Sequence, residues 1–175
     1  MNKAILYSLP LLFLGIVSCK DKPRSNIIIA HRPIVVQQNK PQVIGDAVRN
    51  NIIDWVGGKY TVRVSIKCDT SLPLATDGST KYYDNRVNIN ILRADGSSFF
   101  NRTFTKSDFK LYVDDDYYND GALIGIVFDK VEGESLKFAV SVGSPDKTTD
   151  EFVPLELTVN HVGGVSISRA SDENE

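Results

Sequence analysis

Apolar and polar residues alternate with a period of two along most of this chain, and this alternation constrains the fold more than any other feature. From Tyr60 to Cys68, apolar residues occupy every second position, and threonine, arginine, serine and lysine stand between them. Successive side chains of a β-strand point to opposite faces of a sheet. The pattern therefore predicts a strand that is buried on one face and exposed on the other.

Further runs of this kind predict strands at 87–91, 99–104, 122–129, 136–142, 153–159 and 165–167. Asp95-Gly96 is typical of a tight hairpin turn, and Glu132-Gly133-Glu134 indicates a second hairpin. Pro154 cannot donate a ladder hydrogen bond, which indicates the start or the edge of a sheet. The predicted fold class is all-β, an antiparallel meander of about seven or eight short strands. Such a meander closes as a barrel or as a sandwich, and periodicity does not separate the two.

At most one short helix is expected, as a single turn from Thr105 to Tyr112. Thr105 is suited to the N-cap, and Asp108 stands three residues later, where a capping box requires an acid. One apolar face of each strand should contribute to one common core. The residues predicted to form it are Tyr60, Val62, Val64, Ile66, Val87, Ile89, Ile91, Leu136, Phe138, Val140, Leu155 and Leu157.

The N-terminus has the character of an export signal. Lys3 precedes an apolar run at 4–17, which is too short to span a bilayer stably, and a small residue, Ser18, stands before Cys19. The ending at 14–19 resembles the lipobox of bacterial lipoproteins, in which the cysteine is acylated and becomes the mature N-terminus. The resemblance implies lipidation of Cys19 and membrane association through that lipid. The alternatives are an ordinary signal peptide cleaved near Cys19 and an uncleaved N-terminal anchor.

The residue that follows Cys19 indicates in which membrane a lipoprotein of this kind resides. In some bacteria an aspartate beside the lipidated cysteine marks retention at the inner membrane, whereas this chain has Lys20 there and Asp21 one position later. The pattern favours lipid-anchored placement at the cell outer membrane. It leaves open whether the protein faces the periplasm or the exterior.

The chain divides into four parts: a lipoprotein signal peptide at 1–18, a tether at 19–45, an all-β domain at 46–170 and an acidic, disordered tail at 171–175. Within the tether, apolar islands at 27–29 and 34–36 could add an edge strand.

Composition and missing motifs exclude several classes of function. The net charge is −2 and no basic patch is interleaved with aromatics, so nucleic acid is not an expected partner. Nucleophile-elbow, zinc-helix, Cys-x-x-Cys and phosphate-loop motifs are absent from the sequence, and His31 and His161 are the two histidines. Both are interpreted as surface residues, and no cofactor is expected. Once Cys19 carries lipid, Cys68 has no disulfide partner, and it is predicted to be a small buried hydrophobe.

The acidic stretch at 114–121 offers the best metal candidates, although no metal site is predicted. Asp114, Asp116 and Asp120 could supply alternate oxygen ligands for Ca²⁺. The EF-hand spacing fails, because Tyr118 takes the fifth position and no glutamate falls at the twelfth. A solvated loop that protects a sheet edge explains the same residues.

Arg102 interrupts an aromatic stripe formed by Phe100 and Phe104 on one strand face. If it points inward, a buried guanidinium needs an acid partner, for which Asp129 is the candidate, or an anionic ligand. If the face is external, the two phenylalanines are partly exposed. For either orientation, an ion pair or a side chain that extends to solvent is favoured over a ligand site.

Two tyrosine pairs stand beside acids in predicted loops. Aromatic loops with aspartate and asparagine commonly stack on sugars or hold peptides, so Tyr82, Tyr83, Tyr117 and Tyr118 are candidate contacts for a glycan, a peptide or an envelope protein. Packing beneath long loops is the alternative and the favoured role.

Six phrases of the sequence carry a resemblance to a known family. They are Trp55-Val56-Gly57-Gly58-Lys59-Tyr60, Lys81-Tyr82-Tyr83-Asp84-Asn85, Arg93-Ala94-Asp95-Gly96-Ser97-Ser98-Phe99-Phe100, Phe104-Thr105-Lys106, Leu136-Lys137-Phe138-Ala139-Val140-Ser141-Val142-Gly143 and Asp150-Glu151. Together they resemble domain of unknown function 4738, a small uncharacterised family of bacterial lipoproteins, over roughly 53–167. The resemblance implies lipid anchoring and an all-β domain, and it brings no catalytic residue.

These observations predict a lipid-anchored protein of the cell envelope with a non-enzymatic binding or structural role. The alternative is a hydrolase that acts on envelope or dietary glycans through paired carboxylates, with Asp84, Asp129, Glu151 and Glu156 as candidates. Two carboxylates about 5 to 10 Å apart in one concave pocket, one of them desolvated, would favour the enzyme.

Overall fold

The computed structural model of the protein describes residues 40–170. The predictions for the signal segment, for lipidation of Cys19, for the apolar islands at 27–29 and 34–36, for His31 and for the tail at 171–175 lie outside the described residues. Within residues 40–170, no helix has both the length and the apolar character needed to cross a membrane.

Strands dominate the described part of the chain, and two short helices lie between the seventh and the eighth strand. The elements in chain order are β1 (Gln42–Val43), β2 (Ala47–Trp55), β3 (Gly58–Cys68), β4 (Ala75–Asp77), β5 (Thr80–Tyr83), β6 (Asn85–Arg93), β7 (Ser98–Phe104), the 3₁₀ helix η1 (Lys106–Tyr112), α1 (Asp115–Asn119), β8 (Ala122–Glu132), β9 (Ser135–Gly143), β10 (Phe152–Asn160) and β11 (Val165–Arg169).

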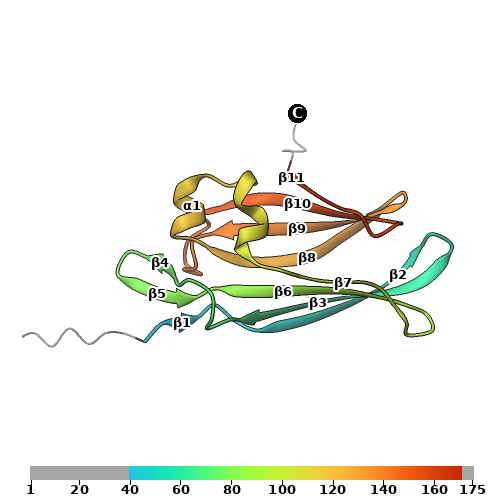
Figure 1. The fold of residues 1–175 in the computed structure, drawn as a ribbon, viewed down its shortest axis with the longest axis horizontal. Coiled ribbons are helices and arrows are strands. Elements are labelled where there is room, and N and C mark those ends of the chain that lie inside the picture. Colours follow the sequence, from blue (N-terminus) through green and yellow to red (C-terminus); the bar gives the residue numbers. More distant parts are fainter. Residues whose placement is uncertain (1–39, 171–175) are drawn as a thin grey trace, which may run out of the picture. The chain divides into compact units, whose positions relative to one another are not determined.

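The fold is sandwich-like. Two antiparallel four-stranded sheets, with strand orders β2-β3-β6-β7 and β11-β10-β9-β8, form its two layers (Figure 1). A third, small sheet has the order β1-β5-β4, in which β5 pairs antiparallel with β4 and parallel with β1. Within residues 40–170 the outer strands of the two large sheets do not pair with each other, so the sheets stack without closing into a barrel. This confirms the predicted all-β class and selects the sandwich.

One core fills the space between the two large sheets, and it contains every residue predicted for it. Ten of the twelve are buried, and the remaining two, Tyr60 and Ile66, are partly buried and pack against the others. Leu123, Phe104 and Phe109 add large side chains that are fully buried. The alternation therefore identified the inward faces correctly, because a period of two places all buried residues of a strand on one side.

Residues 40–170 form eleven strands, and the four beyond the predicted ones are β1, β2, β4 and β5. β2 carries no alternating signal, because its first six residues are all exposed and Ile52 and Ile53 stand side by side. The other three strands have two to four residues, too few to show a period. β1 and the buried Ile44 fall within the stretch predicted as tether, yet they pack into the fold.

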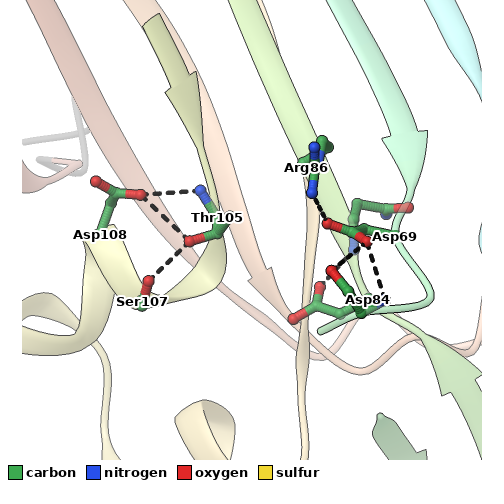
Figure 2. Close-up of polar contacts among 8 residues, drawn as sticks. Asp69, Asp84, Arg86, Thr105, Ser107 and Asp108 are labelled. Atoms are coloured by element: carbon green, nitrogen blue, oxygen red, sulfur yellow. Dashed lines mark hydrogen bonds and ion pairs between the residues drawn. The ribbon is translucent and has the colours of Figure 1, made fainter. Parts of the chain in front are cut away.

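The predicted helical turn is present as η1, and its capping acid takes the predicted place. The Oδ2 of Asp108 accepts hydrogen bonds from the backbone N–H of Thr105, at 2.9 Å, and from its hydroxyl, at 3.4 Å (Figure 2). α1 occupies the acidic stretch at 114–121, which was expected to be a loop. It is a single short helix of five residues with Asp114 at its N-cap.

Two glycines allow three backbone segments to approach closely beside α1. A Cβ atom on Gly121 would lie 2.7 Å from the carbonyl oxygen of Gly143, and one on Gly143 would lie 2.7 Å from the Cβ of Phe152. Both separations are too short for real Cβ atoms, so these positions accept only glycine without a backbone shift. The packing places the last residue of β9 directly against the start of β8 on one side and the start of β10 on the other.

Candidate functional site

A cleft of about 510 Å³ opens between β2 and β8. Its walls come from four stretches that are distant in the sequence: 44–49, Ile66 of β3, 124–127 of β8 with Ser141 of β9, and the loop at 144–152. β2 and β8 are each the outer strand of their sheet. The cleft therefore occupies the side of the sandwich where neither sheet has a further strand among the described residues.

Part of the lining of the cleft is apolar, and this part is called its floor. Ile44, Ile66, Ile124 and Phe152 supply aliphatic and aromatic surface to it, and Gly125 belongs to the same lining. A Cβ atom on Gly125 would meet only the Cδ1 of Ile66, at an ordinary 3.9 Å. Glycine is thus not required here by close packing, and its missing side chain contributes to the depth of the cleft.

The rim of the cleft is charged and predominantly acidic. The acids that line it are Asp46, Asp146, Asp150 and Glu151, and the bases are Arg49 and Lys147. The Oδ1 of Asp146 accepts hydrogen bonds from the backbone N–H and the hydroxyl of Thr148, both at 2.8 Å. These bonds, the backbone one first, lower the pKa of Asp146 and favour its ionised form. With four acids against two bases, the rim has a net negative charge at neutral pH.

Cys68 lies next to Asp46, the residue that precedes β2. It is only partly buried, not the fully buried hydrophobe that was predicted, because it is the last residue of β3. Its backbone N–H donates a hydrogen bond to the Oδ1 of Asp46 at 3.0 Å. His161 is exposed, as predicted, and its Nδ1 lies 3.1 Å from a carboxylate oxygen of Glu134.

The prediction that Tyr82 and Tyr83 lie in a loop is wrong, because both belong to β5. Tyr82 is 8% exposed and forms a small second core with Ile44, Ala75 and Ala122. Burial raises its pKa, and the nearby negative charges of Asp146 and Asp77 raise it further. The short β4–β5 hairpin shares this core, so packing explains Tyr82 without a ligand.

Tyr117 and Tyr118 belong to α1 and not to a loop, and both are partly buried against the main core. The Nζ atoms of Lys106 and Lys110 lie 5.5 and 5.0 Å from the ring centroid of Tyr118. These cations interact with its π-system. Of the four candidate tyrosines, Tyr117 alone lines the cleft between the β4–β5 hairpin and α1.

A second cleft, of about 370 Å³, lies between the β4–β5 hairpin and α1. Asp77, Asp116, Asp120 and Glu151 line it. The Oδ1 of Asp120 accepts a hydrogen bond from the Thr76 hydroxyl at 3.2 Å, and Asp77 accepts one from the hydroxyl of Ser144.

The three candidate calcium ligands do not gather at this cleft. The Oδ1 of Asp114 lies 3.1 Å from the Nη2 of Arg169, whereas Asp116 and Asp120 line the second cleft. Within residues 40–170, no group of three or more histidine, cysteine, aspartate or glutamate side chains is arranged to hold a metal ion.

Arg102 is paired and half exposed. In β7 it stands opposite Ile89, on the inner face of the sheet, but β7 is an outer strand and 47% of the side chain remains accessible. Its Nη2 lies 3.0 Å from the Oδ1 of Asp108, and its Cζ lies 4.8 Å from the ring centroid of Phe104. The favoured ion pair is confirmed, but Asp129 is the wrong partner, because η1 brings Asp108 nearer.

A buried polar cluster that the sequence patterns did not indicate lies at the junction of β5, η1 and β8. The Oδ1 of Asp84 accepts hydrogen bonds from the backbone N–H groups of Asn85, at 2.7 Å, and Leu123, at 2.8 Å. The Nζ of Lys106 lies 3.8 Å from the Oδ2 of Asp84 and donates a hydrogen bond to the carbonyl oxygen of Gly121 at 2.5 Å. Burial raises the pKa of Asp84 and lowers that of Lys106. An acid between two apolar strands is the one sequence signal that could have indicated this cluster.

A second ion pair ties the end of β3 to β6. Arg86 and Asp69 are directed toward each other, and Asp69 also accepts hydrogen bonds from Ser71 (Figure 2). The hydroxyl and the backbone N–H of Ser71, followed by Arg86, lower the pKa of Asp69 to about 2. Asp69 is therefore fully ionised at neutral pH and stabilises the turn that leads into β4.

The four carboxylates considered for hydrolysis do not meet in one pocket. Asp84, the desolvated one, lines neither of the two clefts, whereas Glu151 lines both. Asp129 and Glu156 line a separate depression of about 220 Å³. There the Oε1 of Glu156 lies 2.6 Å from the Nζ of Lys137.

Comparison with known proteins adds a family and no activity. A family model described as Domain of unknown function (DUF4738) matches residues 29–167, which is most of the chain. No curated protein matches the sequence.

Proposed function

The chain belongs to the DUF4738 family, and from this premise we propose that it is a lipid-anchored, non-enzymatic binding protein of the bacterial cell envelope. The anchor is Cys19, and the envelope membrane is the outer membrane. The β-sandwich presents a binding surface to a partner outside the membrane. The family description assigns no activity, and the chain's own residues support the proposal.

The sequence before the sandwich supports the anchor. An apolar run at 4–17 ends at Ser18-Cys19, and Lys20 follows the cysteine. One acyl chain holds a protein to a membrane only marginally, at about 0.8 kcal/mol for each buried methylene, so stable anchoring needs more than one chain. Bacterial lipoproteins with a lipobox of this kind carry more than one acyl chain.

The cleft between β2 and β8 is the observation that carries the binding role. It combines an apolar floor with charged groups at its rim, which is the usual composition of a ligand site. The buried carboxylate Asp84 has its hydrogen bonds satisfied within the fold and lies apart from this cleft. This arrangement supports binding over acid–base chemistry.

The anchor is tested by metabolic labelling with an alkyne fatty acid. We expect label and membrane association in the wild type and loss of both in Cys19→Ser, with the folded domain unchanged by circular dichroism. Label that persists in Cys19→Ser would overturn the lipid anchor.

Glycan hydrolysis remains the second candidate, because four carboxylates line the cleft between the β4–β5 hairpin and α1. Retaining and inverting glycosidases both use a pair of carboxylates. Release of reducing ends from envelope or dietary glycans by the wild type, and its loss in Asp77→Asn or Glu151→Gln, would favour the enzyme. No release from any glycan class would support the binding role.

A further inference from the structure

The outer edge of β2 is long and regular. β2 pairs with β3 over nine consecutive residues without a register shift, and within residues 40–170 it has no other strand partner. β8, on the other side of the cleft, is interrupted by two register shifts in its pairing with β9. Bulges make an edge a poor template for pairing, whereas a straight edge presents a row of unpaired N–H and C=O groups. β2 is therefore the edge suited to accept another strand.

The two faces of β2 differ in chemistry. Val48 and Ile52 lie on one face and are 47% and 78% exposed. Ala47 and Arg49 lie on the opposite face and line the cleft. A strand added beside β2 would place its alternate side chains next to Val48 and Ile52 on one face and over the cleft on the other.

The cleft selects a particular kind of side chain. Its floor, which includes Gly125, is apolar, whereas its rim has four carboxylates against two cations. A side chain with an aliphatic stem and a terminal positive charge complements both features, because the stem covers apolar surface while the charge reaches the acids. Lysine and arginine have this form.

We propose that β2 and the cleft together bind an extended, basic polypeptide segment by strand addition. The segment pairs with the outer edge of β2, its lysine or arginine side chains lie over Gly125 toward Asp150 and Glu151, and its alternate apolar side chains lie beside Val48 and Ile52. Main-chain hydrogen bonds supply affinity and the cleft supplies specificity. This inference rests on the proposed binding function and names its ligand class.

The test uses the full chain in detergent and a short fluorescent peptide of alternating lysine and valine. Its counterpart, with glutamate in place of lysine, is the matched probe. Fluorescence anisotropy should show binding of the lysine peptide that weakens as salt is added, and no binding of the glutamate peptide. Equal binding of both peptides, or of neither, would overturn the proposal.

Two variants locate the site. Gly125→Leu fills the cleft and Asp150→Lys reverses one exposed rim charge, and each should weaken binding of the lysine peptide by about tenfold or more. Glu134→Lys makes the same charge change at the exposed β8–β9 turn and should leave the affinity within about twofold. Because Asp150 is exposed in a loop, its variant tests the site even if Gly125→Leu fails to fold. Unchanged affinity in Asp150→Lys, or an equal loss in Glu134→Lys, would contradict the proposed site.

A second copy of the protein is the other possible occupant of the β2 edge, and sedimentation detects it. If sedimentation shows a dimer that Ile52→Lys disrupts and that the lysine peptide does not, a second copy occupies the β2 edge and the peptide proposal is wrong. Fatty-acid labelling of Cys19 is measured separately. Loss of peptide binding with retained labelling overturns the strand-addition site alone, whereas loss of labelling with retained peptide binding overturns the anchor alone.

Discussion

The Nζ of Lys106 lies 3.8 Å from the Oδ2 of Asp84, and the two side chains are only 10% and 3% exposed. Asp84 precedes β6 and Lys106 begins η1, so the pair joins the first sheet to the segment that crosses to the second. Each charge depends on the other, because a single buried charge without its partner is strongly disfavoured.

Replacing Lys106 with methionine should therefore destabilise the protein by about 3 to 5 kcal/mol, because Asp84 loses its buried counter-charge. The double variant Asp84→Asn, Lys106→Met removes both charges and should recover part of the loss. Urea denaturation followed by circular dichroism measures the free energies of unfolding. A single variant as stable as the wild type would show that the pair does not support the fold.

Asp69 should make stability depend on pH in the acid range. Its pKa is about 2 in the folded protein and 3.8 as the unperturbed value. Because the folded-state pKa is depressed, the stabilisation is present above about pH 4 and is lost as pH falls from 4 to 2. The urea midpoint of Asp69→Asn should fall less steeply over this range than that of the wild type. Asp54→Asn, at an exposed ion pair in the β2–β3 hairpin, is the control. Parallel curves for Asp69→Asn and wild type would contradict the role of Asp69.

Phe138 should be a principal residue of the core. It is fully buried in β9, and its ring lies 5.6 Å from that of Phe128 in an edge-to-face arrangement. Phe138→Ala should lower the free energy of unfolding by about 3 to 5 kcal/mol. Leu111, which is 90% exposed in η1, is the matched control, and Leu111→Ala should change stability by no more than about 0.5 kcal/mol. Similar losses for both variants would mean that the inward face is misassigned.

Gly143 and Gly125 should respond oppositely to alanine. A Cβ on Gly143 would collide with the backbone and side chain of Phe152, so Gly143→Ala should cost about 1 to 3 kcal/mol. A Cβ on Gly125 would meet only Ile66 at an ordinary distance, so Gly125→Ala should be neutral or stabilising by up to about 1 kcal/mol. Thermal unfolding of the two variants checks the sign. Destabilisation of both to the same degree would show that the space beside Gly125 is not free.

Local pattern alone was enough to predict η1 and its capping acid. Thr105 and Asp108 are three residues apart, and their interaction closes within one turn. The hairpins at Gly96 and Gly133 could be predicted in the same way, because both glycines have a positive φ and the chain reverses within a few residues. Such features depend on neighbours in the sequence, so the sequence is sufficient to predict them.

The candidate site could not be predicted in this way. Both tyrosine pairs were predicted to lie in loops because acidic, polar residues surround them in the sequence. Tyr82 is instead buried in β5, and Tyr118 packs against the main core from α1. The partner of Arg102 was misassigned to a distant strand, although Asp108 stands only six residues away. Which acid a long side chain reaches depends on how the intervening segment turns, and periodicity does not describe that turn.

The alternation along the chain was enough to predict the antiparallel strands of the two large sheets and the residues of these strands that face inward, because strand geometry imposes a period of two on burial. Only the packing of distant segments could show that, within residues 40–170, the sheets stack rather than close and β2 is an outer strand, and that Ile44, Ile66, Gly125 and Phe152 line one cleft. These outcomes depend on contacts between residues far apart along the chain. A repeating pattern specifies which face of a strand is apolar, but it does not specify which other strand that face meets.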